Sequence, residues 1–353
     1  MRILVAGATG YIGSRLVPEL LSRGHAVVAA SSSVPRPERF SWGTEVENVV
    51  MDATDPAAVL EALCEVDAVC YLIHSLQVRG FGARDRLAAV NVRRGVDAQG
   101  VRRVVYLSGL VPDVAQTDLS PHIASRLEVE QALAQSSAAT LSLRAGVVIG
   151  AGSTSFEIVR QTASALLVQP IPTWMNSKVQ PIAVSDTIRV LADALESSTV
   201  GAVDIGGPDV VSYPQLLATY ADLAGLYRAQ VPTLGPPTNL TALAAGFACA
   251  APYWTVAALV HSLRHDMVCR PGQPDPAVMD PEDALGLREA IGRALVDHGS
   301  PEAGVTSDPA WSQPPRWDGT VLGVGLPGAR IASAASHVAE HRIRGLLGLI
   351  SPG

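Results

Sequence analysis

The chain has 353 residues, of which 48% are hydrophobic and 17% are charged. This balance is typical of a folded globular protein with a large core, and it excludes an intrinsically disordered chain. The formal net charge is −7, and no run of Lys or Arg offsets it locally. The sequence therefore predicts no nucleic-acid-binding surface.

The first 150 residues alternate short apolar runs with helical stretches, a pattern typical of β-α-β units and a parallel sheet. Strands are predicted over residues 2–6, 26–30, 47–51, 68–73, 104–107 and 140–143. Helices are predicted over residues 11–22, 55–62, 83–99 and 121–134. Because the strands are short and apolar, they suit a sheet that is covered on both faces. The predicted fold class is therefore α/β, with a doubly wound parallel sheet in residues 1–150.

From residue 151 to residue 297 the pattern is less regular, and we expect a smaller, mostly helical part that is interleaved with the last strands of the core. Helices are predicted over residues 155–167, 185–195 and 279–296, and a strand, a turn and a helix start over residues 205–217. Ser185 and Asp186 are expected to cap the second helix and Asp280 the third, because side-chain oxygens there satisfy free backbone N–H groups.

One segment, residues 229–263, tests the expectation that no part of the chain spans a membrane. It contains no Asp, Glu, Lys or Arg, and a transmembrane helix needs about 20 mostly apolar residues. Pro252 and the residues after it interrupt the run. We therefore expect helices that line a pocket for an apolar substrate. Residues 298–353, rich in Gly, Pro and Ser, are predicted as a C-terminal extension in which only residues 331–347 indicate a helix.

The four cysteines, Cys64, Cys70, Cys249 and Cys269, show neither C-x-x-C spacing nor clustering. This pattern predicts reduced thiols in a cytoplasmic protein, with no disulfide framework and no metal site. The first residues lead directly into a predicted strand, so no secretory signal is expected.

Residues 7–13, GATGYIG, follow a predicted strand and open a predicted helix. Glycines at such a turn let the backbone approach a pyrophosphate, and the helix N-terminus presents N–H donors to that anion. The alternative is a purely structural turn. Dinucleotide contacts are expected from Gly7, Thr9, Gly10, Tyr11, Ile12 and Gly13.

Four segments carry a family resemblance: GATGYIG, Asp52-Ala53 after the third predicted strand, Asn91-Val92 on a predicted helix, and LRAGVVIG at 143–150. They resemble the atypical short-chain dehydrogenase/reductases, in particular the NmrA-like NAD(P)H-binding group. YLIHSL, SPHIASRLEVE, FEIVR and QPIAVSD resemble one bacterial branch of that group. The resemblance spans roughly residues 1–300 and implies a Rossmann core with a C-terminal substrate-binding part. It also implies that Asp52 contacts the adenine amino group, with Ala53 as its backbone neighbour.

The choice between NAD and NADP depends on the end of the second predicted strand. An acidic residue there would bind the ribose 2′-hydroxyl and repel a 2′-phosphate, but the sequence has no acid before Glu38. Ser31 and Ser32 can donate hydrogen bonds to a phosphate, with Arg15 or Arg36 as the positive charge. The sequence therefore favours NADP over NAD, although both arginines are equally typical of a solvated surface.

The resemblance implies a Ser-Tyr-Lys set that reduces carbonyl groups, but this chain lacks the Tyr-Lys pair. Lys178 is the only lysine, and Tyr-x-x-x-Lys does not occur. Ser108 ends the fifth predicted strand, and His122 and Arg126 lie one turn apart on the next helix, where they would replace the tyrosine and the lysine. Imidazole exchanges protons near neutral pH, whereas arginine supplies only charge and hydrogen bonds.

Both of these residues have an alternative interpretation. His122 is equally consistent with a surface residue at a helix start. Arg126 would hold the cofactor ribose, or it would form an ion pair with Glu128 or Glu130.

His74 is the remaining catalytic candidate. It follows the fourth predicted strand and should emerge at the carboxyl edge of the sheet, where ligands of open α/β folds bind. It is expected next to the nicotinamide or the substrate; a buried histidine bound to a backbone carbonyl is the alternative. Apolar pocket walls are expected from Phe156, Trp174, Met175 and residues 236–260.

These observations support three hypotheses about function. The first is an NAD(P)H-dependent oxidoreductase that acts on a hydrophobic small molecule and uses His122 or Ser108 as the acid. The second is a cyclase, isomerase or dehydratase that uses His74 and His122 for proton transfer, and the third is a binding protein that senses NAD(P)H. The sequence favours the first, in a monomer or homodimer.

Overall fold

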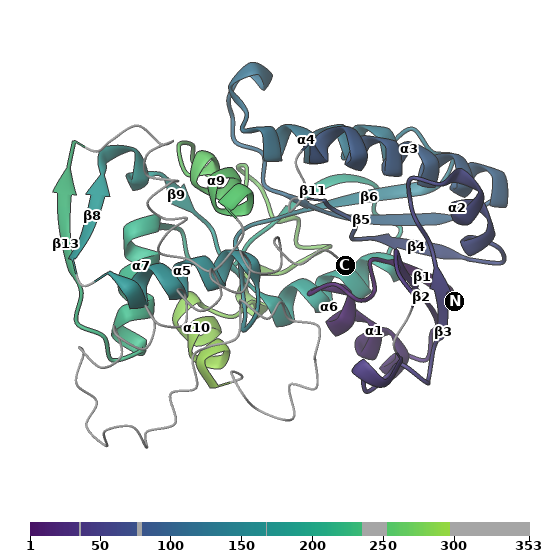
Figure 1. The fold of residues 1–353 in the computed structure, drawn as a ribbon, viewed down its shortest axis with the longest axis horizontal. Coiled ribbons are helices and arrows are strands. Elements are labelled where there is room, and N and C mark those ends of the chain that lie inside the picture. The colour runs from purple at the N-terminus through teal and green to yellow at the C-terminus, as the bar shows by residue number, and fades with distance from the viewer. Residues whose placement is uncertain (35–36, 76–79, 167, 235–252, 297–353) are drawn as a thin grey trace, which may run out of the picture.

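The computed structural model describes residues 1–34, 37–75, 80–166, 168–234 and 253–296. Its centre is a seven-stranded sheet with the order β11-β6-β5-β4-β1-β2-β3, in which all neighbours are parallel (Figure 1). The strands are β1 Arg2–Ala6, β2 Ala26–Ser31, β3 Glu47–Val50, β4 Ala68–Tyr71, β5 Arg103–Gly109, β6 Ala139–Ala145 and β11 Gly201–Ile205. This topology confirms the predicted doubly wound α/β fold.

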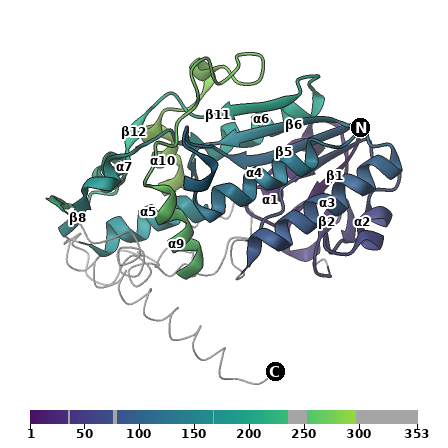
Figure 2. The same cartoon turned by 90° about the horizontal axis from the view of Figure 1, so that it is seen from above.

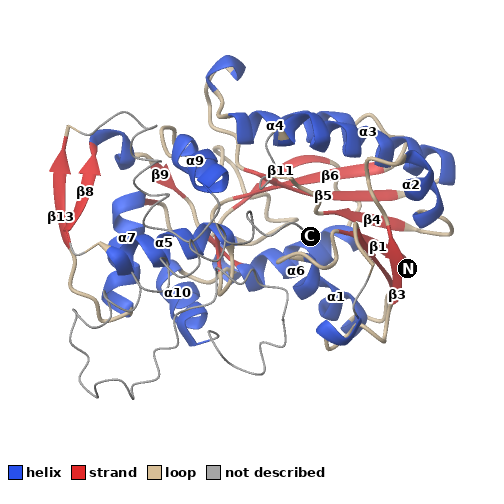
Figure 3. Cartoon of the chain, viewed as in Figure 1, coloured by secondary structure: helices blue, strands red, loops and turns tan. Residues whose placement is uncertain are grey.

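Helices cover both faces of this sheet, as the secondary-structure colouring makes clear (Figure 3). They are α1 Gly13–Ser22, α2 Pro56–Ala62, α3 Phe81–Gln99, α4 Pro121–Leu133 and α6 Val184–Glu196. Alternation along β1 sends Ile3 and Val5 into the core under α1 and α6, and Leu4 and Ala6 into the core under α2, α3 and α4. Figure 2 shows α3 and α4 side by side along the sheet.

The chain after β6 builds a second cluster of elements beside the carboxyl edge of the sheet (Figure 1). Its helices are α5 Thr154–Ala165, α7 Tyr213–Leu223, α9 Tyr253–Ser262 and α10 Leu287–Val296. Its short strands pair as β7 Val148–Ile149 with β10 Ile182–Ala183, β9 Lys178–Val179 with β12 Val211–Ser212, and β8 Val168–Pro172 with β13 Ala229–Thr233. Phe156, Leu216 and Ile291 are among the buried residues of its own hydrophobic core. Strand β11 belongs to the main sheet.

Two predicted helix caps in this part are wrong. The N-cap of α6 is Ala183, without a side-chain cap, and the Asp186 carboxylate instead accepts from Leu285 N at 2.9 Å. Asp280 caps only a short 3-10 turn, and α10 begins at Leu287, whose N–H donates to Asp209 at 2.6 Å. Asp280 thus keeps a local hydrogen bond, from Glu282 N, but α10 starts at a residue that bonds to a distant segment, so the helix predicted over residues 279–296 is interrupted.

Within the described ranges, no helix has both the length and the apolar character needed to cross a membrane. In the apolar segment 229–263, residues 229–233 form strand β13 where helices were expected, whereas α9 is helical and its Val256 and Val260 are buried. Residues 235–252 lie outside the described residues, as do the predicted C-terminal extension over 298–353 and its predicted helix.

Candidate active site

The glycine loop follows β1 at the point where the strand order reverses, between β1 and β4. This switch point is where open parallel sheets bind ligands. Gly7 has φ +93°, which L side chains rarely adopt, and its N–H donates to Ala30 O at 3.1 Å. A Cβ on Gly13 would lie 2.3 Å from Gly7 O. The loop is therefore folded tightly against the start of α1, as a backbone cradle for a pyrophosphate requires.

The other predicted residues of this motif lie on the same turn. Gly10 N–H donates to Gly7 O at 3.0 Å, and the Ile12 carbonyl accepts the first helical hydrogen bond from Leu16 N at 2.9 Å. Thr9 is exposed, whereas Gly10, Tyr11 and Ile12 line the cleft described below.

At the end of β2, Ser31 is buried and its Oγ donates to Ser33 O at 2.8 Å, while Ser32 is exposed. Arg15 does not provide the counter-charge considered for this position. Its guanidinium donates to the carbonyls of Tyr11 (3.0 Å) and Ala151 (3.1 Å) and lies 3.9 Å above the Tyr11 ring. Arg36 lies outside the described residues.

At the end of β3, Asp52 and Ala53 form a turn that is held from two sides. The Asp52 carboxylate accepts from Thr54 N at 2.9 Å and Thr54 Oγ1 at 2.8 Å, and these hydrogen bonds lower the pKa of Asp52. Asn91 Nδ2 donates to Ala53 O at 3.0 Å. Asp52 is thus an ionised, half-exposed acceptor at a fixed position, which suits the adenine contact implied by the family resemblance.

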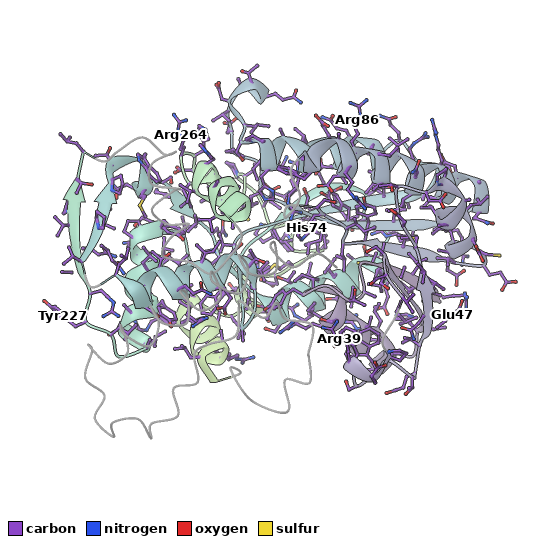
Figure 4. All side chains as sticks on the ribbon, viewed as in Figure 1. Arg39, Glu47, His74, Arg86, Tyr227 and Arg264 are labelled. Carbon is purple, nitrogen blue, oxygen red and sulfur yellow. The ribbon has the colours of Figure 1, made fainter. Side chains whose placement is uncertain are left out.

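The glycine loop lines a cleft of about 280 Å³ that is also lined by His74, Ser108, His122 and Arg126. These four residues come from the segments after β4, at the end of β5 and on α4. Figure 4 places His74 near the centre of the molecule, where the sheet and the C-terminal part meet. Apolar side chains also line the cleft, among them Ile123, Ile158, Leu259, Val260 and Leu263.

His122 and Arg126 contact each other on one face of α4. Arg126 Nε lies 3.4 Å from His122 Nε2, and Arg126 Nη1 donates to Leu107 O at 3.1 Å. Because the guanidinium can only donate, Nε2 of His122 is the acceptor and Nδ1 carries the proton. Burial, with the charge of Arg126 and the neighbouring His74, holds the pKa of His122 well below its usual value. His122 is therefore buried and neutral, and the surface interpretation is wrong.

Arg126 does not form the ion pair with Glu128 or Glu130 that was considered for it. Glu130 pairs with Arg144 at 2.5 Å, and within the described part of the chain no carboxylate lies within 4.0 Å of Arg126. Two of its five N–H groups are used by Leu107 and His122, and these contacts orient the guanidinium at the edge of the cleft.

His74 lies at the cleft with its side chain accessible, so it is not a buried histidine held by a carbonyl. Protein atoms nevertheless surround it on the remaining sides, and this desolvation together with Arg126 lowers the pKa of His74 to about 4. At neutral pH it is an uncharged imidazole that can donate and accept hydrogen bonds.

Ser108, the second-last residue of β5, is 3% exposed and lines the cleft. Its Oγ lies near the Tyr106 hydroxyl but forms no hydrogen bond of standard geometry with a described residue. A buried hydroxyl in this situation is suited to bind a ligand atom.

The predicted pocket walls are partly wrong. Phe156 and Met175 belong to the core of the C-terminal part and do not line the cleft. Ile158, two residues after Phe156 on α5, lines it instead. A helical period alone could not decide which of these side chains faces the cleft, because both faces of α5 are apolar in places.

The low pKa of His122 predicts how stability depends on pH. In the unfolded chain this imidazole binds a proton near pH 6.5, whereas the folded protein keeps it neutral. The free energy of unfolding should therefore fall as the pH drops below 6.5, by at most about 1.4 kcal/mol per pH unit for one histidine. Urea titrations at several pH values between 7.5 and 5 should show that the free energy of unfolding depends less steeply on pH in His122→Gln. An unchanged slope would contradict the assigned burial.

Comparisons with known proteins now identify part of the chain. Residues 7–165 match a family model described as NAD(P)H-binding. The match covers less than half of the chain and shows that this part is similar to NAD(P)H-binding domains. This match confirms the resemblance to NAD(P)H-binding proteins over residues 7–165 and supports a nicotinamide dinucleotide as the cofactor; the NmrA-like assignment stays a prediction.

Individual relatives match a longer part of the chain than this family model does. The chain is 28% identical over 221 residues to an uncharacterized protein of Mycobacterium tuberculosis, which covers 62% of this chain but 23% of the relative. It is 28% identical over 258 residues to 3-diazoavenalumate denitrifying reductase of a Streptomyces species, covering 64% of this chain and 82% of the relative. The chain thus spans about a quarter of the mycobacterial protein and most of the reductase.

Solved structures show the same fold. UDP-glucose 4-epimerase of Thermotoga maritima matches with a TM-score of 0.63 and 16% identity, over 84% of this chain and 98% of that one. At this identity the match establishes the fold of the NAD(P)H-binding domain and its C-terminal neighbour.

Proposed function

We propose that this protein is an NAD(P)H-dependent oxidoreductase that reduces a hydrophobic small molecule. One observation carries the proposal: a single cleft is lined by the glycine loop, by the polar residues His74, Ser108, His122 and Arg126, and by apolar side chains. The match of residues 7–165 to an NAD(P)H-binding family model and a relative that is named a reductase support it. Residues 151–297 would supply the substrate-binding part, since Ile158 and Val260 line the cleft.

The residues of the cleft suggest how the reduction proceeds. A bound NAD(P)H would supply the hydride that adds to a carbonyl carbon, and a proton from solvent would add to the carbonyl oxygen, which gives an alcohol and NAD(P)⁺. Ser108 Oγ and an N–H of His74 would hydrogen-bond the carbonyl oxygen, and the positive charge of Arg126 would stabilise the negative charge that develops there. His122 would orient Arg126 through Nε2, in place of the acid role predicted from the sequence.

The non-redox alternative is less well supported by this geometry. It requires His74 and His122 to exchange protons near neutral pH, but the pKa values of both are lowered. NADP is proposed over NAD because the end of β2 carries Ser31 and Ser32 and no acid. A cytoplasmic location and a monomer or homodimer stay predictions.

Activity measurements test this proposal. NADPH oxidation followed by absorbance with a panel of aromatic ketones and enones should show turnover, with a lower Kd for NADPH than for NADH. Ser108→Ala and His74→Gln should each lower kcat by about 10²-fold or more, by loss of hydrogen bonds to the reacting oxygen. Arg264→Gln, a surface change, is the control. Substrate conversion without NADPH oxidation would support the non-redox alternative instead.

A further inference from the structure

The charge distribution of the cleft limits the class of substrate. Of the described residues that line the cleft, Arg126 alone is ionised at neutral pH, because His74 and His122 are neutral there. The other polar side chains that line it are hydroxyls. The cleft therefore offers a ligand one positive charge, that of Arg126, in largely apolar surroundings.

This charge is not matched by the protein at short range. The described residues place no carboxylate within 4.0 Å of Arg126. Asp85 on α3 interacts electrostatically with Arg126, but it is 4% exposed and does not line the cleft, and burial raises the pKa of its carboxyl. A cation held next to apolar surface without a partner is unfavourable, and a ligand anion relieves this cost.

The orientation of Arg126 suits recognition of such an anion. Leu107 O and His122 Nε2 each accept one N–H of the guanidinium and the Tyr106 hydroxyl lies near it, so at most three N–H groups are left for a ligand. A guanidinium with a fixed plane binds a carboxylate through two parallel hydrogen bonds. The neighbouring wall of Ile158, Leu259 and Val260 would contact the apolar remainder of the same ligand.

We propose that the substrate is an apolar carboxylate: an aryl or alkyl oxo acid, or an unsaturated acid, whose carboxylate pairs with Arg126. This inference rests on the proposed function for the reacting group, but the recognition itself requires no turnover. It places the anion at α4 and the hydrocarbon body against α5 and α9.

The test is binding by matched pairs of ligands to the NADP⁺-loaded protein. Aryl and alkyl 2-, 3- and 4-oxo acids of increasing length would be compared with their methyl esters by titration calorimetry. The acids should bind about tenfold to a hundredfold more tightly than the esters, as expected for a charge-assisted hydrogen bond. Arg126→Gln should remove this preference, Arg126→Lys should keep part of it, and Arg86→Gln on the exposed face of α3 should keep all of it.

The outcomes separate the two proposals. Equal binding of acids and esters across the whole panel, or a preference that survives in Arg126→Gln, would overturn the inference. The same holds if Arg126→Gln weakens NADPH binding and leaves the acid preference intact, because Arg126 would then serve the cofactor ribose. Acid preference without NADPH oxidation would instead count against the oxidoreductase and leave the substrate class standing. Melting curves of each variant report whether it is folded.

Discussion

Gly13→Ala should bind NADPH at least a hundredfold more weakly than the unchanged protein. The added Cβ would lie 2.3 Å from Gly7 O and 2.8 Å from Ala8 Cα. Both are backbone atoms of the glycine loop, so relief requires α1 to move away from the loop rather than a side chain to rotate. The pyrophosphate cradle and the helix N-terminus would then separate, and the loss of several backbone hydrogen bonds to an anion accounts for the size of the effect.

Fluorescence titration with NADPH measures this loss, and Gly292→Ala on α10 is its matched control. A Cβ at Gly292 meets no atom within 4 Å, and the residue lies inside a helix. That variant should bind NADPH normally and be equally or slightly more stable. Normal NADPH affinity in Gly13→Ala would show that the cofactor does not use this loop.

Arg160→Met should destabilise the protein by about 3–5 kcal/mol, the cost of leaving a buried charge without its partner. Arg160 Nε lies 2.6 Å from Glu157 Oε2, and the two side chains are 3% and 0% exposed. Glu157 also accepts from Gly152 N at 3.2 Å, so the pair holds the turn before α5, next to the cleft. The effect should therefore appear in both unfolding and ligand binding.

Urea unfolding provides the measurement, with Arg293→Met as the control. Arg293 pairs with Glu289 at 2.8 Å, but both side chains are 56% exposed, so its loss should cost about 0.5 kcal/mol or less. A double change of Glu157 and Arg160 to Gln and Met should recover part of the stability, since the uncompensated charge is gone. Equal effects of the two arginine changes would contradict the burial of the pair.

Local sequence patterns were sufficient for the elements of the sheet domain. The strand runs and glycine motif depend on side chains within a few residues of each other, and all six predicted strands occur in the structure with boundaries that differ by at most two residues. Local patterns were not sufficient at Asp186 and Asp280. Their side chains are good caps in isolation, but partners from distant segments determine where α6 and α10 begin.

By itself, the sequence determined the doubly wound sheet, the position of the glycine loop, the absence of a Tyr-Lys pair and the candidates His74, Ser108, His122 and Arg126. Only the tertiary structure decided how far each of these four residues is buried and which of them contact each other. Packing of α4 against β5 buries His122 and makes it a neutral acceptor for Arg126, whereas sequence analysis predicted an acid. Protonation depends on burial and on charges brought near by folding, and neither is encoded in the spacing of residues along a helix.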